Sequence, residues 1–317
     1  MPVLPSWVRS ATFALSALMG LAPALAQVGG SAAAPKAVQA DPAVAVRRAR
    51  LAGINDKIRQ ARLQPAKFRP VDVRKLIVLS PDLFTDLRPK IDLQQLPVRD
   101  QGGTRGTCSV HALAFCQEFM TATKLNQKGL NYSVEYLNWA GNMAAGKPYY
   151  DGGFFSDLDK GYQTYGEVTE QACPYQVSFN PNWAPPPTTV TIGKQAPRHI
   201  ATFIKAWDNS KGASPAQLEE VISNLKAQRP VAVGVLWPLT FGTQEIDGVD
   251  VMKVPARPAT FDGHSVVLVG FRRDVKFPGG GYFIFRNSWS KTWGDAGYGY
   301  MPFQYVLSLA NDLLAYK

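Results

Sequence analysis

The chain has 317 residues, of which 46% are hydrophobic and 18% are charged, a composition typical of a globular protein and not of a disordered one. This length suffices for one large domain or two modest ones. Three cysteines are too few for a disulfide scaffold, and the sequence lacks the cysteine and histidine spacings of metal sites. We therefore expect neither a metal nor another cofactor.

The net charge of +10 is unevenly distributed along the chain. Residues 27–83 carry 11 basic and 4 acidic side chains, whereas residues 84–317 carry 22 and 20. The basic residues that precede Phe68 are not interleaved with aromatic ones, so a surface for stacking bases is absent. We therefore expect no nucleic-acid partner and assign the basic excess to a separate N-terminal segment.

Residues 1–26 have the pattern of a secretory signal peptide. Arg9 precedes an apolar stretch over residues 11–21, and Ala24-Leu25-Ala26 fits an A-x-A cleavage site. The stretch is shorter than the roughly 18 residues of a membrane-spanning helix, although an uncleaved anchor is the alternative interpretation. The pattern predicts an exported protein, periplasmic or secreted, that is monomeric and without stable membrane insertion.

Residues 27–83 read as a basic pro-segment or linker. The Ala/Gly-rich part up to residue 40 predicts disorder. Asp41-Pro42 then resembles a helix N-cap followed by a first-turn proline. Apolar residues recur at helical spacing as far as Pro65 and predict an amphipathic helix of about six turns: Val44, Leu51, Ile54, Ile58 and Leu63. Prolines beyond it predict an extended stretch.

The globular body covers residues 84–317 and divides into two halves. Helices are predicted over 107–124, 133–139 and 157–165, and a proline-rich loop over 180–187. Strands are predicted over 199–207, 230–236, 264–271 and 281–286, with one helix over 214–227. A helical half, about 100–187, thus precedes a β-rich half, about 188–303, and a cleft between two such layers suits a substrate chain.

Cys108 is the candidate nucleophile in the helical half. It follows Gly106-Thr107, where a loop enters a helix that Thr107 can cap. The helix macrodipole and a nearby imidazolium would stabilise its thiolate. Gln101, in the Gly-rich loop before it, can donate its side-chain amide to an oxyanion together with the Cys108 backbone N–H. Taken alone, Cys108 could equally be a buried helix cysteine.

His264 is the candidate base, at the start of an apolar strand. Asn287 can accept a hydrogen bond from the imidazole and orient the ring without adding a charge, and Trp289 could shield that bond from water. His111 is a second candidate, but side chains three residues apart on a helix lean together, which leaves it poorly placed to reach a leaving group. Thiol, imidazole and carboxamide together predict acyl transfer through a thioester at Cys108.

Cys116 and Cys173 remain after Cys108 is set aside as a free thiol. In an oxidising compartment they could form a disulfide, or both could be buried free thiols. The sequence leaves both possibilities open.

Five ordered segments resemble those of the papain-like cysteine peptidases, family C1, over roughly residues 90–303. Residues 101–115 resemble the block around the family's nucleophile, and 262–271 and 287–298 resemble its histidine strand and its N-S-W block. Residues 131–137 and 152–175 are similar to the segments between. The resemblance implies an α+β fold with a helical left domain, an antiparallel β-barrel-like right domain and the active-site cleft between them.

The resemblance also implies a function and the residues that perform it. The chain is expected to be a bacterial-type exported thiol peptidase, made as a zymogen, that hydrolyses proteins or peptides. The implied catalytic roles are nucleophile, acid/base, orienting group and oxyanion donor, for Cys108, His264, Asn287 and Gln101 in that order. Trp289 supports them. Residues expected to contact the substrate are Gly152, Gly153, Phe155 and Gly263, with an apolar side chain preferred at P2.

Three departures from the family pattern lie near the nucleophile. The spacing from Gln101 to Cys108 is one residue longer, Thr104-Arg105 stands where the family has its first disulfide cysteine, and Ser109 replaces an aromatic residue. They motivate two alternatives: a catalytically impaired peptide-binding or inhibitory module on the same fold, or an amidase of cell-wall peptides.

Overall fold

The computed structural model describes residues 42–71, 80–146 and 150–317, with side chains described from residue 53 onward. The predicted leader, residues 1–26, and the predicted disordered stretch up to residue 40 lie outside the described residues. Within the described ranges, none of the helices combines the length and the apolar character needed to cross a bilayer.

Seven elements precede the main strands of the sheet. They are α1 (Pro42–Leu63), β1 (Phe84–Asp86), α3 (Arg88–Leu93), α4 (Cys108–Leu125), α5 (Val134–Ala144), α6 (Phe155–Tyr165) and α7 (Pro187–Gln195). A helix is present as α1 where the amphipathic helix is predicted. The second predicted helix extends five residues further, to Ala144, because its N-cap Ser133 is followed by an uninterrupted run of good helix formers and apolar residues.

The β-rich half is one antiparallel sheet with helices beside it. Its strands are β2 (Ala201–Lys205), β3 (Val231–Pro238), β6 (Thr260–Arg273), β7 (Gly281–Arg286), β8 (Tyr298–Pro302) and β9 (Ala310–Tyr316), hydrogen-bonded in the order β2-β9-β3-β6-β7-β8. Strand β1 adds to β6, whereas β4 (Thr243–Ile246) and β5 (Val249–Met252) form a separate hairpin. The described strands form an open series and do not close into a barrel.

Short helices complete this half: α8 (Pro215–Lys226), the 3-10 turn η1 (Arg257–Ala259) and α9 (Phe303–Leu309). Ser214 and Gln217 form a capping box at the start of α8, which confirms the predicted helix there. Strand β6 begins at Thr260, four residues before the predicted start, because residues 260–262 already pair with the end of β3. His264 therefore lies inside a strand and not at its edge.

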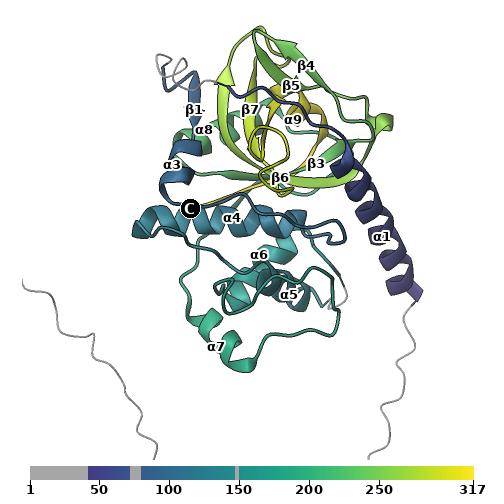
Figure 1. Cartoon of the computed structure of the whole chain (residues 1–317), viewed down its shortest axis with the longest axis vertical. Helices are drawn as coiled ribbons and strands as arrows, with labels where there is room; N and C mark the ends of the chain where they lie inside the picture. Colours follow the sequence, from purple (N-terminus) through teal and green to yellow (C-terminus); the bar gives the residue numbers. More distant parts are fainter. Residues whose placement is uncertain (1–41, 72–79, 147–149) are drawn as a thin grey trace, which may run out of the picture. The chain divides into compact units, whose positions relative to one another are not determined.

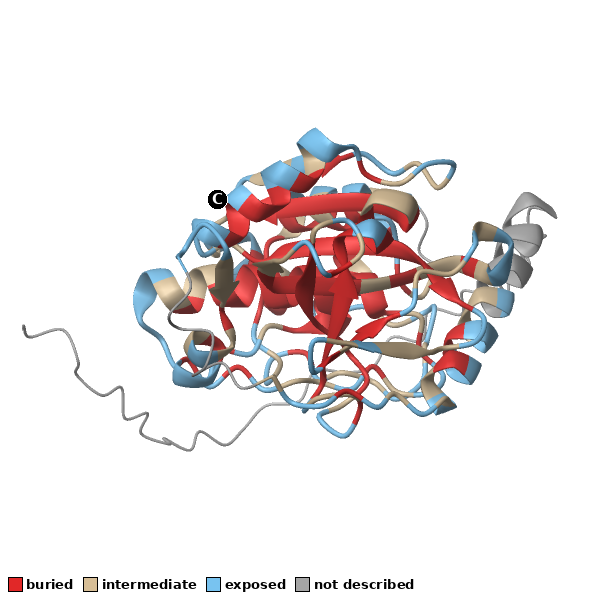
Figure 2. Cartoon of the chain, turned by 90° about the horizontal axis from the view of Figure 1, so that it is seen from above, coloured by how far each residue is buried: buried red, intermediate tan, exposed pale blue. Residues whose placement is uncertain are grey.

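Helix α4 lies between the sheet and the helices α5 and α6 (Figure 1). Its residues are buried on nearly every side for the first three turns, as its apolar composition predicts. Figure 2 shows that buried residues concentrate in this helix and in the central strands. The catalytic candidate Cys108 thus begins a helix that is buried over most of its length.

The three cysteines are all free and buried. Cys116 belongs to the main core, where its thiol donates to the carbonyl of Pro230 at 3.8 Å. Cys173 lies in a small separate cluster with Tyr136 and Val168. The possible Cys116–Cys173 disulfide is therefore not formed, because the two side chains belong to different packing layers.

Candidate functional site

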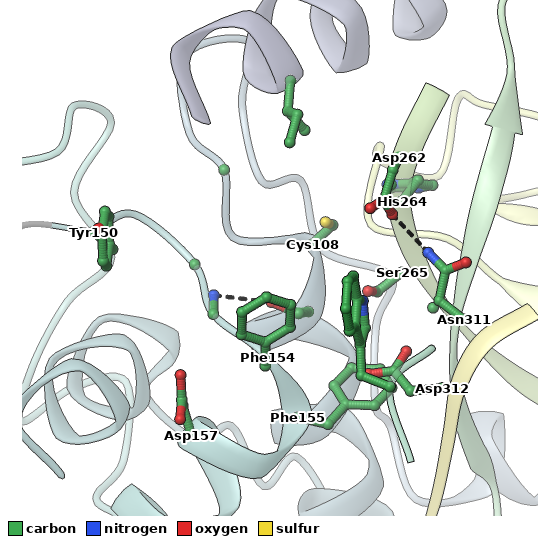
Figure 3. A pocket seen from close by; sticks show the side chains of 18 of the residues that line it. Cys108, Tyr150, Phe154, Phe155, Asp157, Asp262, His264, Ser265, Asn311 and Asp312 are labelled. Atoms are coloured by element: carbon green, nitrogen blue, oxygen red, sulfur yellow. Dashed lines mark hydrogen bonds between the residues drawn. The ribbon is translucent and has the colours of Figure 1, made fainter. Parts of the chain in front are cut away.

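A cavity of about 400 Å³ lies between the helical half and the sheet. The helical half contributes Cys108 and residues of the segment around Gly152-Gly153, and the strand-rich half contributes His264 and part of β9. Figure 3 shows Cys108 and His264 on facing elements of this cavity. The structure therefore brings the predicted thiol and imidazole to one site, as their places in the two halves indicate.

The Cys108 thiol sits at the first residue of α4, as predicted, but Thr107 does not cap the helix. The Thr107 hydroxyl pairs instead with the Tyr175 hydroxyl at 2.6 Å, so the predicted capping role is wrong. Burial raises the pKa of the Cys108 thiol above its usual value, and hydrogen bonding from Ser265 only partly offsets that effect. The thiol is consequently protonated at neutral pH in this arrangement.

The Nε2 atom of the His264 ring is hydrogen-bonded to Asn287. Its Nε2 lies 2.8 Å from Oδ1 of Asn287, and that oxygen also accepts the backbone N–H of Ser288. Asn287 Oδ1 is therefore the acceptor, so Nε2 carries the proton and Nδ1 presents its lone pair. Nδ1 is buried and has no hydrogen-bond partner among the described residues. That leaves it available to take a proton within the cavity.

Two tryptophans enclose the imidazole. Trp289 stacks on the ring with centroids 4.4 Å apart, and Trp237 meets it edge-on at 4.8 Å. Burial lowers the pKa of His264 to about 4, and the hydrogen bond that the ring donates to Asn287 opposes this shift. The predicted shielding of the His264–Asn287 bond by Trp289 agrees with this stacking, and the ring is neutral at pH 7.

Gln101 is completely buried and held at both ends of its amide. Its Oε1 accepts the Ser288 hydroxyl at 2.7 Å, and its Nε2 donates to the Arg105 carbonyl at 3.1 Å. It lies beside the cavity but is not among the described residues that line it. One of the two N–H groups of the amide is therefore engaged within the loop itself.

All four residues expected to contact the substrate line the cavity: Gly152, Gly153, Phe155 and Gly263. Gly152 has a φ of +97°, and a Cβ there would lie 2.2 Å from the Gly106 carbonyl oxygen, so only glycine fits. The Gly153 N–H donates to the Ser109 hydroxyl at 3.3 Å. A substrate carbonyl would have to displace that hydroxyl.

His111, the second candidate base, does not line this cavity. Its Nδ1 pairs with the Thr107 carbonyl at 3.0 Å and its ring meets Tyr175 edge-on. Burial, aided by repulsion from Arg99, lowers the pKa of His111 to about 3. His111 instead lines a smaller cavity that Cys108 and Asn287 also line.

Sequence reasoning missed several residues of the cavity. Ser265 touches the thiol, and Phe154 and Trp207 contact each other across the two halves, 5.2 Å between ring centroids. Asn311 and Asp312 of β9 line the opposite wall (Figure 3), and burial raises the pKa of Asp312 to about 7. The only sequence feature that could have indicated these cavity residues is the polar pair Asn311-Asp312 within an otherwise apolar C-terminal run.

Helix α1 also lines the cavity, through Ile54, Asn55 and Ile58. Arg62 clamps the helix to Asp100 with bonds of 2.6 and 2.7 Å, and Arg59 donates to the Gly103 carbonyl at 3.0 Å. The predicted basic helix therefore lies against the loop before the nucleophile.

Among the described residues, no group of three His, Cys, Asp or Glu side chains gathers to hold a metal.

Comparisons with known proteins identify the family of the chain. Residues 85–308 match the model of the papain family of cysteine proteases. An uncharacterized peptidase C1-like protein of Acanthamoeba polyphaga mimivirus is 24% identical over 249 residues, which cover 73% of each chain. A cathepsin B-like protein of Giardia intestinalis is 26% identical over 229 residues, covering 69% of this chain and 68% of its own.

Solved structures share the fold at low identity. Xylellain, a cysteine protease from Xylella fastidiosa, superposes with a TM-score of 0.56 at 21% identity, covering 80% of this chain and 91% of its own. The proform of the ragweed cysteine protease Amb a 11 gives 0.51 at 19% identity, covering 83% and 75%. The chain belongs to the papain family of cysteine proteases and is a cysteine-type peptidase with the papain-like α+β fold.

Proposed function

We propose that this peptidase hydrolyses peptide bonds through a Cys108 thioester, with His264 as acid and base. The observation that carries the proposal is the buried, unpartnered Nδ1 of His264 in the cavity that also holds the thiol. Nδ1 takes the thiol proton, and the thiolate sulfur attacks the substrate carbonyl carbon. Nδ1 then returns the proton to the leaving amine.

Asn287 orients the imidazole throughout this cycle. Its bond to Nε2 leaves Nδ1 as the only ring nitrogen that changes its protonation. The tetrahedral oxyanion accepts the Cys108 backbone N–H and the second N–H of the Gln101 amide. In the second half-reaction, water attacks the thioester carbonyl while Nδ1 removes its proton, and the thiol is regenerated.

The substrate chain binds along the segment that contains Gly152 and Gly153. The Gly153 N–H becomes available once Ser109 turns away. Phe155 forms a buried wall of the pocket for the P2 side chain, and Gly263 permits close approach of the substrate backbone beside His264. These contacts agree with a protein or peptide substrate bound in extended form.

We further propose that the chain is exported and made as a zymogen whose residues 27–83 form the pro-segment. Ile58 of α1 is buried against the cavity, and the Arg62–Asp100 pair holds the helix there. A substrate could not occupy the part of the cavity that this helix lines. Removal of residues 1–26 in export and of 27–83 in maturation would leave the body from residue 84 as the active form.

A hydrolysis assay tests the peptidase proposal. Casein and dipeptide substrates are incubated with the protein under reducing conditions, with Cys108→Ala as the control. Thiol-dependent hydrolysis that disappears in the variant is the expected result. Cleavage of cell-wall peptides alone would favour the amidase, and substrate binding without hydrolysis would favour the non-catalytic module.

The zymogen proposal has a separate test. The full chain and the chain lacking residues 1–83 are compared at equal concentrations of reactive thiol. We expect the shorter form to be at least about tenfold more active, since α1 occupies part of the cavity. Equal activity of the full chain with its N-terminal segment still attached would refute the proposal.

A further inference from the structure

A fully buried arginine lies in the loop before the nucleophile. The Arg105 side chain is fully buried, with 0% exposure. Each of its three guanidinium nitrogens makes a hydrogen bond or an ion pair with a neighbouring group. Nε lies 3.0 Å from both carboxylate oxygens of Asp151, and the two terminal nitrogens lie 2.8 and 3.2 Å from Glu135. One terminal nitrogen also donates to the Gln176 carbonyl, and the guanidinium stacks 4.6 Å from the Tyr175 ring centre.

Burial disfavours the charged form of Arg105, but hydrogen bonds to Asp151 and Glu135 outweigh it and raise the guanidinium pKa. A positive charge is therefore fixed inside the helical half. Two carboxylates against one cation leave a net negative charge, which the Gly106 N–H offsets by donating to Asp151 at 2.7 Å. Replacing buried ion pairs by well-packed apolar residues is often neutral or stabilising in proteins, so a buried ion cluster is weak evidence of a purely stabilising role.

The ion cluster of Arg105, Glu135 and Asp151 connects the loop before Cys108 with the segment that contains Gly152. The Arg105 carbonyl accepts the Gln101 amide, and Gly106 is bonded to Asp151. Asp151 directly precedes Gly152, which lies so close to Gly106 that no side chain fits between them. Moving the guanidinium would therefore shift the oxyanion loop and the substrate-binding glycine together.

Tyr175 also links Arg105 to the loop before the nucleophile. Its ring lies on the guanidinium, and its hydroxyl donates to the Gln101 carbonyl at 2.9 Å and pairs with Thr107, the residue before Cys108. The position of Gln101 is thus fixed through both its backbone and its side chain by groups that contact Arg105.

We infer that Arg105, with Glu135 and Asp151, is a positioning device for the oxyanion loop, standing in this chain where the family pattern has a disulfide cysteine. The inference rests on the proposed function, because it assumes that Gln101 and Cys108 perform the chemistry. Arg105 is a positioning residue and does not touch the substrate. The loop is held by ion pairs and hydrogen bonds, so reducing agents leave its geometry unchanged.

The test compares Arg105→Met with Arg88→Met, each expressed as the full chain and then matured. Arg88 also joins two carboxylates, Asp86 and Asp295, but does not line the cavity. Reactive Cys108 is titrated with iodoacetamide, and kcat and KM are expressed per titrated thiol. We expect kcat/KM to fall about a hundredfold in Arg105→Met, mostly in kcat, because oxyanion donors are misplaced. The alkylation rate should stay within about threefold, since alkylation forms no oxyanion.

Arg105→Lys keeps the charge without the planar fork, and we expect a loss of about tenfold. If Arg105→Met does not fold, Arg105→Lys tests the positioning role in its place. The inference is overturned if either Arg105 variant hydrolyses peptide as fast per thiol as Arg88→Met. It is equally overturned if alkylation and hydrolysis fall in parallel, which a general structural defect would cause.

Hydrogen exchange over residues 101–108 separates this inference from the proposed function. We expect faster exchange there in Arg105→Met than in the wild type or Arg88→Met, whether or not the wild type is active. A wild type without Cys108-dependent hydrolysis but with this change would refute the proposed function and retain the anchoring. Unchanged exchange would refute the anchoring even in an active enzyme.

Discussion

The Cys108 thiol and the His264 imidazole are both neutral in this structure. Burial raises the pKa of the thiol and lowers that of the imidazole to about 4, so each group keeps its uncharged form at neutral pH. The sequence predicted a thiolate beside an imidazolium. The difference has a physical cause, since both groups are buried and Trp237 and Trp289 enclose the imidazole, which disfavours its charged form.

Asn287 provides a prediction at this scale. Asn287→Ala removes the acceptor that orients His264 and leaves Nε2 buried without a partner. The loss of such a hydrogen bond costs about 1–3 kcal/mol, so we expect kcat to fall about tenfold to a hundredfold. Steady-state hydrolysis by the matured protein, with thiol titration as a control for folding, checks it. An unchanged kcat would contradict the orienting role.

The catalytic candidates could be predicted residue by residue because they lie in local motifs. Cys108, His264 and Asn287 each lie within a recognisable block, and the structure brings His264 and Asn287 into contact. Ser265 and Asp312 could not be predicted in the same way. Their places at the cavity depend on the pairing of β3 with β6 and β9, which local patterns do not reveal.

At the scale of elements, the proposed pro-segment role depends on how α1 is held against the body. Ile58 is 3% exposed against the body, whereas Leu63 on the same helix is 75% exposed. The Arg62–Asp100 pair adds a charged contact at the edge of the helix. Docking thus combines the buried side chains of Ile58 and Ala61 with polar contacts of Arg59 and Arg62, and a charge at Ile58 tests the apolar part.

Ile58→Glu should undock α1, because it buries a carboxylate in an apolar contact worth about 1.5–3 kcal/mol. We expect iodoacetamide to alkylate Cys108 at least about tenfold faster in the full chain as water enters the cavity and the thiol pKa falls. Leu63→Glu is the matched control and should leave the rate unchanged. Equal rates in the two variants would rule out a covering role for α1.

Helices were predicted better than strands. The helices α4, α5, α6 and α8 carry strong periodicity or caps, and their predicted positions agree with the structure to within a few residues. Strands β8 and β9 were not predicted: β8 lies in a Gly-rich stretch, and β9 is buried on both faces and so lacks the alternation of a half-buried strand. The β4–β5 hairpin was missed because its strands have only four residues each.

For the whole molecule, His111 links stability to acid. Its pKa is about 3 in the folded chain against 6.5 for an ordinary histidine, so the unfolded state binds more protons between these values. The contribution that neutral His111 makes to the free energy of unfolding is fully present above pH 6.5. It is lost as the pH falls towards 3.

Replacing His111 by Gln should remove this one pH-dependent contribution. The free energy of unfolding of the wild type, relative to His111→Gln, should fall by about 1.4 kcal/mol for each pH unit below about 6. Urea denaturation of both proteins at several pH values from 7 to 4.5 measures the difference. Parallel curves would show that His111 is not held neutral by the fold.

The central claim is that Cys108 is a nucleophile served by His264, and covalent labelling tests it most directly. The matured protein is treated with an epoxide-type irreversible inhibitor of thiol peptidases, and the modified residue is mapped by mass spectrometry. We predict one adduct, on Cys108, with Cys116 and Cys173 unmodified because they are buried in packed clusters. Labelling should be lost in His264→Ala. A folded protein that takes no label at Cys108, or takes it equally without His264, would contradict the account.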